Sequence, residues 1–382
     1  MTSRERVIRT LRRQRVDRMP IDLGMHYSTG ISAFAYWNLR EHLGLSTDNI
    51  VIPDMIQFLA RVDEDVMQRF HVDCILLHPG WPQTHRWRPR GRGRGAERRY
   101  DFIIPKTAQP QLQPDGSWLM QRKGATLCMP SGGFFFDGGW PGFSDDPTFD
   151  RTYREAERIY KETPYATFWM GFGGYFSQDP DWLCRMIEEP QKVLEENEAQ
   201  CQRDIETAGE AIHRMGKYVQ GFCLNSDLGA QNGPICSLAH YQQFAAPFVR
   251  KLCDFIHRNS DCKTFLHCCG SVKPLIPTLI DSGIDVLNPV QISASNMDPR
   301  QLKSDLGDRI VFWGGGCNTQ TVLGRKTPQE VAQHVRELVS VFRPGGGFVF
   351  NQVHNIMGDV PSENIVAMLD TAYAESFYRD LA

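Results

Sequence analysis

The second half of the chain alternates between short apolar runs and longer stretches with helical periodicity. The apolar runs are rich in β-branched and aromatic residues and span 218–225, 263–268, 284–290, 309–315 and 347–353. Each run is continuously apolar rather than alternately polar, which is typical of parallel strands buried on both faces. Between two of them, Thr327, Pro328 and Glu330 form a capping pattern that predicts the start of a helix. The pattern therefore predicts parallel strands that alternate with helices.

Three further apolar runs precede this region, at 18–24, 73–78 and 165–171, which gives eight candidate strands in all. Eight strands with helices between most of them predict an α/β fold of the (β/α)8 TIM-barrel class, with residues 1–382 forming a single domain. The alternative is an open doubly wound sheet. No G-x-G-x-x-G segment follows any early strand, so the usual signature of that alternative is missing.

Residues 85–146 interrupt the alternation and predict an insertion on the barrel. The insertion begins with a Gly/Arg-rich tract between Arg86 and Arg99, which is interpreted either as a solvated loop or as a site for RNA or an acidic protein. A β-hairpin is predicted around the Pro114-Asp115-Gly116 turn. The aromatic residues 134–136 and Trp140 are interpreted either as a small satellite core or as a lid over a ligand.

Composition narrows the class of protein without identifying a function. The chain has 382 residues, of which 41% are hydrophobic and 23% charged, and a formal net charge of -3, which argues against a general affinity for nucleic acid. Its apolar stretches are far shorter than the roughly 20 residues that span a bilayer, and its first helix is charged, so we expect a cytoplasmic protein without a membrane segment. The 11 cysteines are mostly expected to be free and buried, with metal ligation or catalysis as the exceptions.

If the fold is a barrel, the functional residues lie at the carboxyl ends of the strands. We expect substrate binding or acid–base roles for Asp22, His26, Asp227 and His354, although Asp22 is equally compatible with a capping role. Substrate contacts are expected for three asparagines: Asn225, Asn288 and Asn351.

A histidine and two cysteines follow one of the strands, in the sequence TFLHCCGSV. Side chains two residues apart on a strand point the same way, so His267 and Cys269 face one centre while Cys268 faces the opposite side. Cys317 ends a later strand and is the candidate for a third ligand. One histidine and two cysteines match a catalytic zinc with an open fourth position, and buried inert thiols remain the alternative.

Four segments, at 226–237, 265–291, 307–323 and 344–365, resemble the uroporphyrinogen decarboxylase superfamily, and within it the zinc-dependent, corrinoid-linked methyltransferase branch. The resemblance implies a (β/α)8 barrel and a zinc bound by His267, Cys269 and Cys317. It also implies methyl transfer between a small donor or acceptor, such as a thiol or folate, and the cobalt of a corrinoid protein. No D-x-H-x-x-G segment occurs, so the corrinoid (methylcobalamin) is expected on a partner protein; a homodimer is compatible with the family.

Two other functions stay open from the sequence. One is cofactor-free decarboxylation of the uroporphyrinogen type, but the family binds its eight-carboxylate substrate with arginines after the first strand, and residues 22–45 contain no arginine before Arg40. Unpaired carboxylates in a pocket would each cost several kcal/mol. The other is a non-catalytic binding module that acts through the Arg86 to Arg99 tract.

Overall fold

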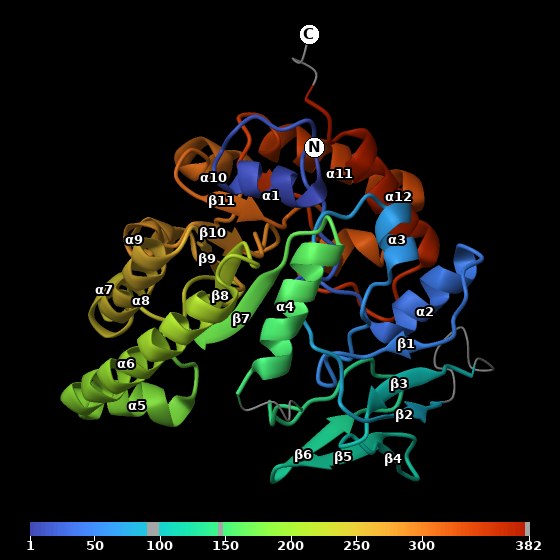
Figure 1. Cartoon of the computed structure of the whole chain (residues 1–382), viewed down its shortest axis with the longest axis horizontal. Helices are drawn as coiled ribbons and strands as arrows, with labels where there is room; N and C mark the ends of the chain where they lie inside the picture. The colour runs from blue at the N-terminus through green and yellow to red at the C-terminus, as the bar shows by residue number, and fades with distance from the viewer. Residues whose placement is uncertain (90–98, 144–147, 379–382) are drawn as a thin grey trace.

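The computed structural model describes residues 1–89, 99–143 and 148–378. At its centre is a six-stranded sheet in the order β12-β11-β10-β9-β8-β7, in which all neighbouring strands are parallel (Figure 1). The strands are β7 (Phe168–Gly173), β8 (Gly221–Asn225), β9 (Lys263–His267), β10 (Val286–Asn288), β11 (Val311–Trp313) and β12 (Phe348–Val349). The predicted α/β class with parallel strands is confirmed for this sheet.

Helices follow each strand of the sheet, as parallel connections require. They are α5 (Pro180–Glu188) and α6 (Pro190–Met215), α7 (Leu238–Phe244) and α8 (Ala246–Asn259), α9 (Ile276–Asp281), α10 (Pro299–Leu306), α11 (Pro328–Phe342) and α12 (Ser362–Ala374), with short turns at Lys273–Leu275 and Thr319–Leu323. The predicted capping box is present at the start of α11, where the side chains of Thr327 and Glu330 bind each other's backbone N–H groups.

The predicted strands at 18–24 and 73–78 are not regular strands in the structure. Each is represented by a single parallel bridge, Ile21 to Phe350 beside β12 and Cys74 to Ala166 before β7. The Asp73 N–H donates to the Ile21 carbonyl oxygen at 2.7 Å, which joins the two segments to each other. The two segments thus connect the edge of the sheet at β12 with the segment before β7 at the other edge. They form no regular strands, so an eight-stranded closed barrel stays a prediction.

A buried ion-pair cluster ties the N-terminal helix α1 (Ser3–Leu11) to these segments. Asp73 is fully buried, and its carboxylate accepts hydrogen bonds from Arg6 at 2.6 Å, from Arg18 at 2.7 Å and from the Ile21 N–H at 2.9 Å. Because a buried carboxylate is stable only when charges and donors surround it, this cluster fixes the positions of the two bridging segments.

The insertion contributes strands to two small sheets below the main sheet in Figure 1, one mixed and one antiparallel. Strands β2 (Thr84–Trp87) and β3 (Phe102–Pro105) pair with each other, and β3 also pairs with β1 (Ile50–Val51). Strands β4 (Gln111–Leu112), β5 (Trp118–Arg122) and β6 (Ala125–Met129) form the second sheet, and the turn between β4 and β5 contains the predicted Pro-Asp-Gly. The remaining helices are α2 (Ala33–His42), α3 (Glu64–Arg69) and α4 (Asp150–Glu162).

Most of the arginine tract, residues 90–98, lies outside the described residues. Of its described members, Arg86 and Arg88 form ion pairs with Asp101 on the surface. In the aromatic cluster, Phe136 is buried in the core, whereas Trp140 is 71% exposed, and the lid role stays a prediction.

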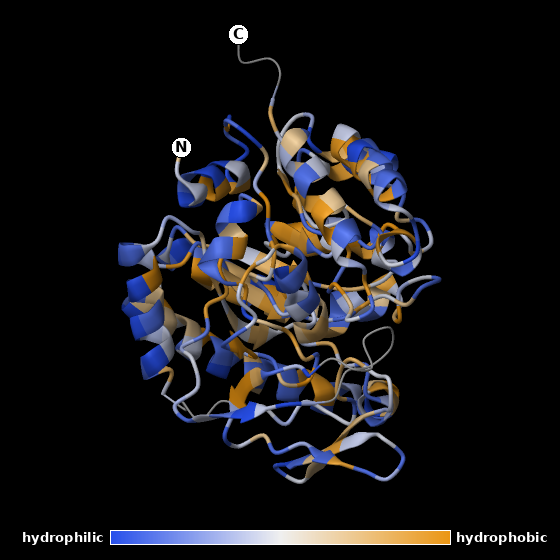
Figure 2. Cartoon of the chain, turned by 90° about the vertical axis from the view of Figure 1, so that its right-hand side faces the viewer, coloured by the Kyte–Doolittle hydropathy of each residue, from blue (hydrophilic) through white to orange (hydrophobic). Residues whose placement is uncertain are grey.

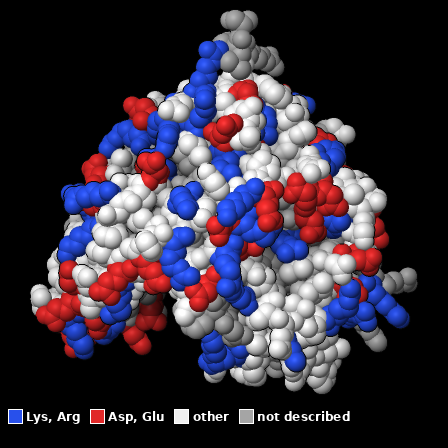
Figure 3. All heavy atoms as spheres, viewed as in Figure 1, with Lys and Arg blue, Asp and Glu red and all other residues white. Residues whose placement is uncertain are grey.

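Hydropathy and charge follow the usual distribution of a protein with a buried sheet. The central strands are hydrophobic and the helices carry hydrophilic outer positions (Figure 2). Positive and negative side chains are interspersed on the face that Figure 3 shows. Among the described residues, no helix combines the length and apolar character needed to cross a bilayer.

Candidate active site

The candidate site begins with three residues in one register row at the carboxyl ends of adjacent strands. Asn225 at the end of β8 pairs with His267 at the end of β9, and His267 pairs with Asn288 at the end of β10. Paired residues of neighbouring strands project to the same face, so their side chains form one cluster. The parallel register therefore places three polar groups where the sequence predicted a functional edge.

Asn288 determines which ring nitrogen of His267 carries the proton. The Asn288 Nδ2 donates to the Trp313 carbonyl oxygen at 3.1 Å, and a carbonyl oxygen only accepts, so the amide orientation is fixed. The Asn288 Oδ1 therefore faces the His267 Nδ1 at 3.0 Å and accepts a hydrogen bond from its N–H group. Burial lowers the pKa of His267, so the ring is neutral and its Nε2 presents a lone pair. This is the tautomer that a metal-binding histidine needs.

Cys269 lies on the same side as His267, with its Sγ 3.5 Å from the His267 Nε2. Cys268 points away, is fully buried, and its sulfur accepts the Leu228 N–H at 3.3 Å. The two cysteines therefore separate as the strand alternation predicted. Gly270 completes the turn with a φ of +89°, and a Cβ there would come within 2.3 Å of Gly229, so only glycine fits beside that loop.

His354 supplies the third donor of the cluster. The ligand atoms of His267, Cys269 and His354 all lie within 4.8 Å of one another. Burial lowers the pKa of His354 to about 4, so its imidazole is also neutral near pH 7. It is one of nine described non-glycine residues with a positive φ, at 62°, which turns the chain so that a residue beyond the last strand reaches the site.

Cys317, the third ligand predicted from the sequence, is not part of this group. Its side chain is fully buried in the apolar core, and burial raises the pKa of its thiol. The Cys317 carbonyl oxygen accepts the Val353 N–H at 2.8 Å, so Cys317 adjoins the loop that carries His354. The residue of this region that joins the group of possible donors is therefore His354, and a role for Cys317 as a ligand stays a prediction.

Asp227 adds a negative charge to the cluster. Its Oδ1 accepts the Cys269 N–H at 2.9 Å and lies 3.5 Å from the His267 Nε2. Burial and the nearby Asp227 carboxylate raise the pKa of the Cys269 thiol. A carboxylate, a thiol sulfur and an imidazole lone pair thus converge on a small volume, and a cation between them would relieve their mutual repulsion.

His26 reaches the cluster from the N-terminal segment. Its ring stacks on that of His267 with centroids 5.4 Å apart, and its Nδ1 contacts the Ser28 Oγ at 2.8 Å. The Ser28 hydroxyl donates to the Asn288 Oδ1 at 2.7 Å, so both histidines are held by one asparagine oxygen. The His26 Nε2 is buried and has no hydrogen-bond partner among the described residues, which leaves it available to a ligand.

Asp22 and Asn351 lie behind the cluster rather than in it. The Asp22 carboxylate accepts from the Trp313 Nε1 at 2.8 Å and from the Met25 N–H at 2.9 Å, and burial raises its pKa to about 6. The Asn351 Nδ2 donates to the Asp22 and Thr29 carbonyl oxygens. These contacts connect the first segment to β12, and for Asp22 they favour the capping role over the catalytic one.

A cavity of about 360 Å³ opens beside the three donors. Among the predicted residues it is lined by Asn225, Asp227, His26, His267 and His354. Trp140, for which the sequence left open a role as a lid over a ligand, also lines it, and the sequence analysis missed the other walls, which are Tyr27, Ser28, Gln57 and Met170. Tyr27 and Ser28 directly follow His26, so their place at the end of the first predicted strand could have identified them as cavity residues. Gln57 and Met170 lie in segments without a motif, so the sequence contained no indication of them.

The donor set fits a zinc ion. A tetrahedral ion with nitrogen at about 2.1 Å and sulfur at about 2.3 Å separates its ligand atoms by about 3.6 Å, close to the 3.5 Å between the His267 Nε2 and the Cys269 Sγ. Two neutral imidazoles and one cysteine, which would bind as its thiolate, are donors that zinc prefers, and three protein ligands are the number found in catalytic zinc sites.

Residues 207–374 match the uroporphyrinogen decarboxylase (URO-D) family. Two similar curated proteins are named uroporphyrinogen decarboxylase: one from Pseudoalteromonas atlantica, 25% identical over 163 residues, and one from Psychromonas ingrahamii, 34% identical over 151 residues. These matches cover 39% and 37% of this chain, and only 43% and 38% of the two relatives.

A solved structure described as a methyltransferase from Methanosarcina mazei has the same fold over nearly the whole chain. It covers 98% of this chain and 99% of its own, with a TM-score of 0.58 and 14% sequence identity. At that identity the likeness concerns the fold alone. The family match thus concerns the C-terminal part of the chain, whereas the shared fold extends over nearly all of it.

Proposed function

We propose that the protein is a zinc-dependent methyltransferase that moves a methyl group between a small molecule and the cobalt of a separate corrinoid protein. The observation that carries the proposal is the cluster of His267, Cys269 and His354, which opens onto a cavity. The proposal includes a (β/α)8 barrel, with the segments at Ile21 and Cys74 in the first two strand positions, and a cytoplasmic location.

Zinc at this site would supply Lewis-acid chemistry, holding a thiol acceptor as its thiolate or polarising the heteroatom of a methyl ether or thioether. Asn288 keeps the His267 Nε2 deprotonated and oriented toward the cluster. The His26 Nε2 is placed to hydrogen-bond a polar atom of the substrate, and Asn225 lines the same cavity. Met170 and Trp140 give the cavity an apolar side that suits a methyl group and limits water.

The charge of the cavity argues against the decarboxylase reaction that the relatives' names describe. Among its described lining residues, the cavity at His267 contains Asp227 and no arginine or lysine. A substrate with eight carboxylates would meet a negative charge there instead of cations. Of the two aspartates for which the sequence predicted acid–base or substrate roles, Asp227 lines this cavity, whereas Asp22 is engaged by Trp313 and does not.

Metal analysis of the purified protein tests the proposal. We expect about one zinc per chain in the wild type and in Cys268→Ala, because Cys268 faces the core. His267→Ala and Cys269→Ala should lose the zinc. His354→Ala and Cys317→Ala decide the third ligand: loss in the first variant alone supports the geometry described above, and loss in the second alone supports the assignment made from the sequence.

Activity is measured with methylcobalamin and a thiol acceptor by following demethylation of the cobalt in the visible spectrum. The zinc-free variants should be inactive, whereas Cys268→Ala should retain activity. A wild-type protein that binds no zinc, or one whose activity survives in Cys269→Ala, would contradict the proposal.

A further inference from the structure

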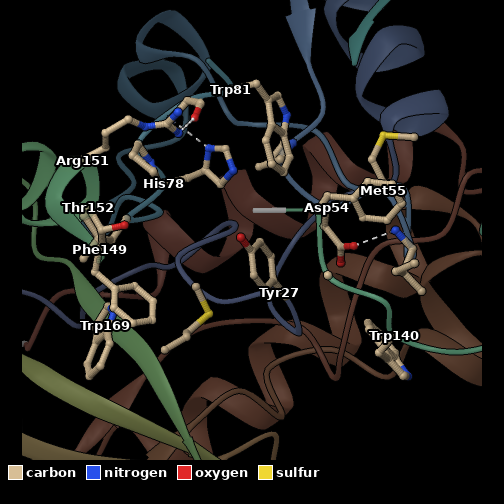
Figure 4. A pocket seen from close by; sticks show the side chains of 18 residues that line it. Tyr27, Asp54, Met55, His78, Trp81, Trp140, Phe149, Arg151, Thr152 and Trp169 are labelled. Carbon is tan, nitrogen blue, oxygen red and sulfur yellow. Dashed lines mark hydrogen bonds between the residues drawn. The ribbon is translucent and has the colours of Figure 1, made fainter. Parts of the chain in front are cut away.

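Trp140 lies where three cavities meet. The cavity at His267 shares lining residues with one cavity of about 300 Å³, shown in Figure 4, and with another of about 320 Å³. Tyr27 and Met170 are common to the cavity at His267 and the first of these neighbours. Among the described residues, Trp140 is the only one that lines all three cavities. A movement of this one side chain therefore changes access to the candidate site.

The Trp140 indole lacks the contacts that hold the other tryptophans in place. It is 71% exposed, and in Figure 4 it stands apart from the other labelled aromatic side chains. Within the described part of the chain it makes no hydrogen bond and no contact with another aromatic ring. Each of the other seven of the eight tryptophans contacts at least one such ring. A large apolar ring that no neighbour holds gains free energy when it moves to a position where it is buried.

Glycines stand on both sides of Trp140 and its neighbour Pro141. Gly139 has a φ of 122° and Gly142 a φ of 63°, both in the region that favours glycine. A Cβ at either position would meet no atom outside its chain neighbours closer than 4.0 Å, so the space around both glycines is open. The backbone can therefore rotate at two points, one before the tryptophan and one after it, as the hinges of a moving loop require.

The ends of this segment are fixed, whereas its middle is not. The backbone N–H and carbonyl oxygen of Asp137 pair with the backbone of Cys128 at 2.9 and 2.8 Å. At the other end, the Gly142 carbonyl oxygen accepts from the Arg122 Nε at 3.2 Å. Between these anchors, residues 139–141 form no hydrogen bond with any other described residue. A segment without hydrogen bonds between two fixed points moves at a small free-energy cost.

We propose that residues 139–142 form a lid that carries Trp140 from solvent onto the mouth of the cavity at His267 when a ligand is bound there. In the closed position the indole packs against Met170 and Tyr27, because a thioether and an aromatic ring both form favourable contacts with it. Closure removes the apolar surface of Trp140 from water and keeps water away from the ligand. The inference rests on the proposed function in one respect: the ligand that closes the lid is the thiol acceptor.

Acrylamide quenching of tryptophan fluorescence in the full, zinc-loaded chain tests the lid. The difference between the wild type and Trp140→Phe isolates the signal of Trp140. Without thiol this signal should be quenched readily, because the side chain is 71% exposed. Saturating 2-mercaptoethanol should lower its quenching to that of the packed tryptophans, and should have no effect in Cys269→Ala, which holds no zinc. Quenching of Trp140 that the thiol leaves unchanged in the wild type would overturn the lid.

The affinity for 2-mercaptoethanol, measured by calorimetry, gives a second reading. Trp140→Ala should keep its zinc and its unfolding midpoint, because the side chain that it removes is exposed. It should bind the thiol about three- to tenfold more weakly, because the closed state no longer contributes to the affinity. Phe135→Ala is the matched control: Phe135 is an exposed aromatic residue of the same insertion but does not line the cavity at His267. Its thiol affinity should stay within about twofold of the wild type. Equal affinities in Trp140→Ala and the wild type would contradict the lid.

Hydrogen exchange separates the lid from the proposed function. In the zinc-free protein the amides of Gly139, Trp140 and Gly142 should exchange rapidly, while that of Asp137 is protected by its pairing with Cys128. If the wild type binds no zinc, the proposed function fails; rapid exchange then retains the lid, whereas slow exchange overturns it. If zinc binds and the thiol leaves Trp140 exposed, only the lid fails.

Discussion

Replacing Asn288 with alanine tests whether the metal site depends on the groups behind it. Asn288 makes three hydrogen bonds: its Oδ1 accepts from His267 at 3.0 Å and from Ser28 at 2.7 Å, and its Nδ2 donates to Trp313 at 3.1 Å. Among the described residues, Asn288 is the one group that accepts from the His267 Nδ1, and the variant removes it. The ring is then free to place its proton on Nε2, where it blocks the metal.

The expected loss of zinc affinity is about ten- to a hundredfold, the usual effect of removing the hydrogen-bond partner of a ligating histidine. That corresponds to about 1.4–2.7 kcal/mol of binding free energy. The free energy of unfolding should also fall, by about 1–3 kcal/mol for each buried polar group that no water or neighbour satisfies. The first quantity is read from competition with a chromophoric chelator at pH 7, and the second from urea unfolding of the zinc-free protein.

Asn288→Asp is the control that separates orientation from packing. Aspartate has the same shape as asparagine and keeps an oxygen that accepts from His267, but its carboxylate has no donor for the Trp313 carbonyl oxygen. We expect its zinc affinity to stay within about threefold of the wild type. If Asn288→Ala unfolds more easily but binds zinc as tightly as the wild type, Asn288 has a structural role only and the reasoning about the His267 tautomer is wrong.

Two further predictions concern stability and pH. Asp73→Ala should lower the free energy of unfolding, measured in urea, by about 3–5 kcal/mol, because two arginines lose their buried partner. The control, Asp370→Ala, breaks an exposed ion pair and should change this free energy by less than about 1 kcal/mol. Equal effects of the two variants would contradict the role given to burial. Zinc binding at pH 7 should release about one proton per chain, because the Cys269 thiol has a raised pKa and must ionise to bind the metal. His354 has a pKa of about 4, so its imidazole has no proton to release. The number of protons is measured by calorimetry in buffers of different ionisation enthalpy. Zinc affinity should therefore rise with pH through the neutral range and lose this dependence in Cys269→Ser; a wild type that releases no proton would exclude Cys269 as a ligand.

The parallel sheet was predictable because its signal is carried by continuous apolar runs. All five runs of the C-terminal half contain a strand, although each strand is shorter than its run, since the ends of a run pass into the loop while still buried. The strands predicted at 18–24 and 73–78 differ for a physical reason. Their positions are fixed by polar contacts around Asp73 and by single bridges instead of a ladder, and an apolar pattern does not reveal that difference.

The pairing of His267 with Cys269 was predictable because a strand constrains its side chains to alternate. The strand ended at His267, yet Cys269 still faced the same way, because its N–H is held by Asp227 and the following Gly270 allows the turn. Asp227 was predicted as a functional residue, but its contact with the Cys269 backbone joins two loops that are distant in sequence. Sequence spacing contains no information about such a contact.

The third donor shows where reasoning from strand ends reaches its limit. Both Cys317 and His354 follow strands of the same sheet, and the backbone of Cys317 is hydrogen-bonded to the residue before His354. Which side chain enters the site depends on the loop after β12, where His354 adopts a φ of 62° and directs its imidazole toward His267. A zinc ion bound to Cys317 would require its sulfur to leave the apolar core and ionise, against the burial that raises its pKa. The imidazole of His354 is already neutral and already lines the cavity, so we expect it to be the third ligand, and the zinc contents of His354→Ala and Cys317→Ala decide between the two.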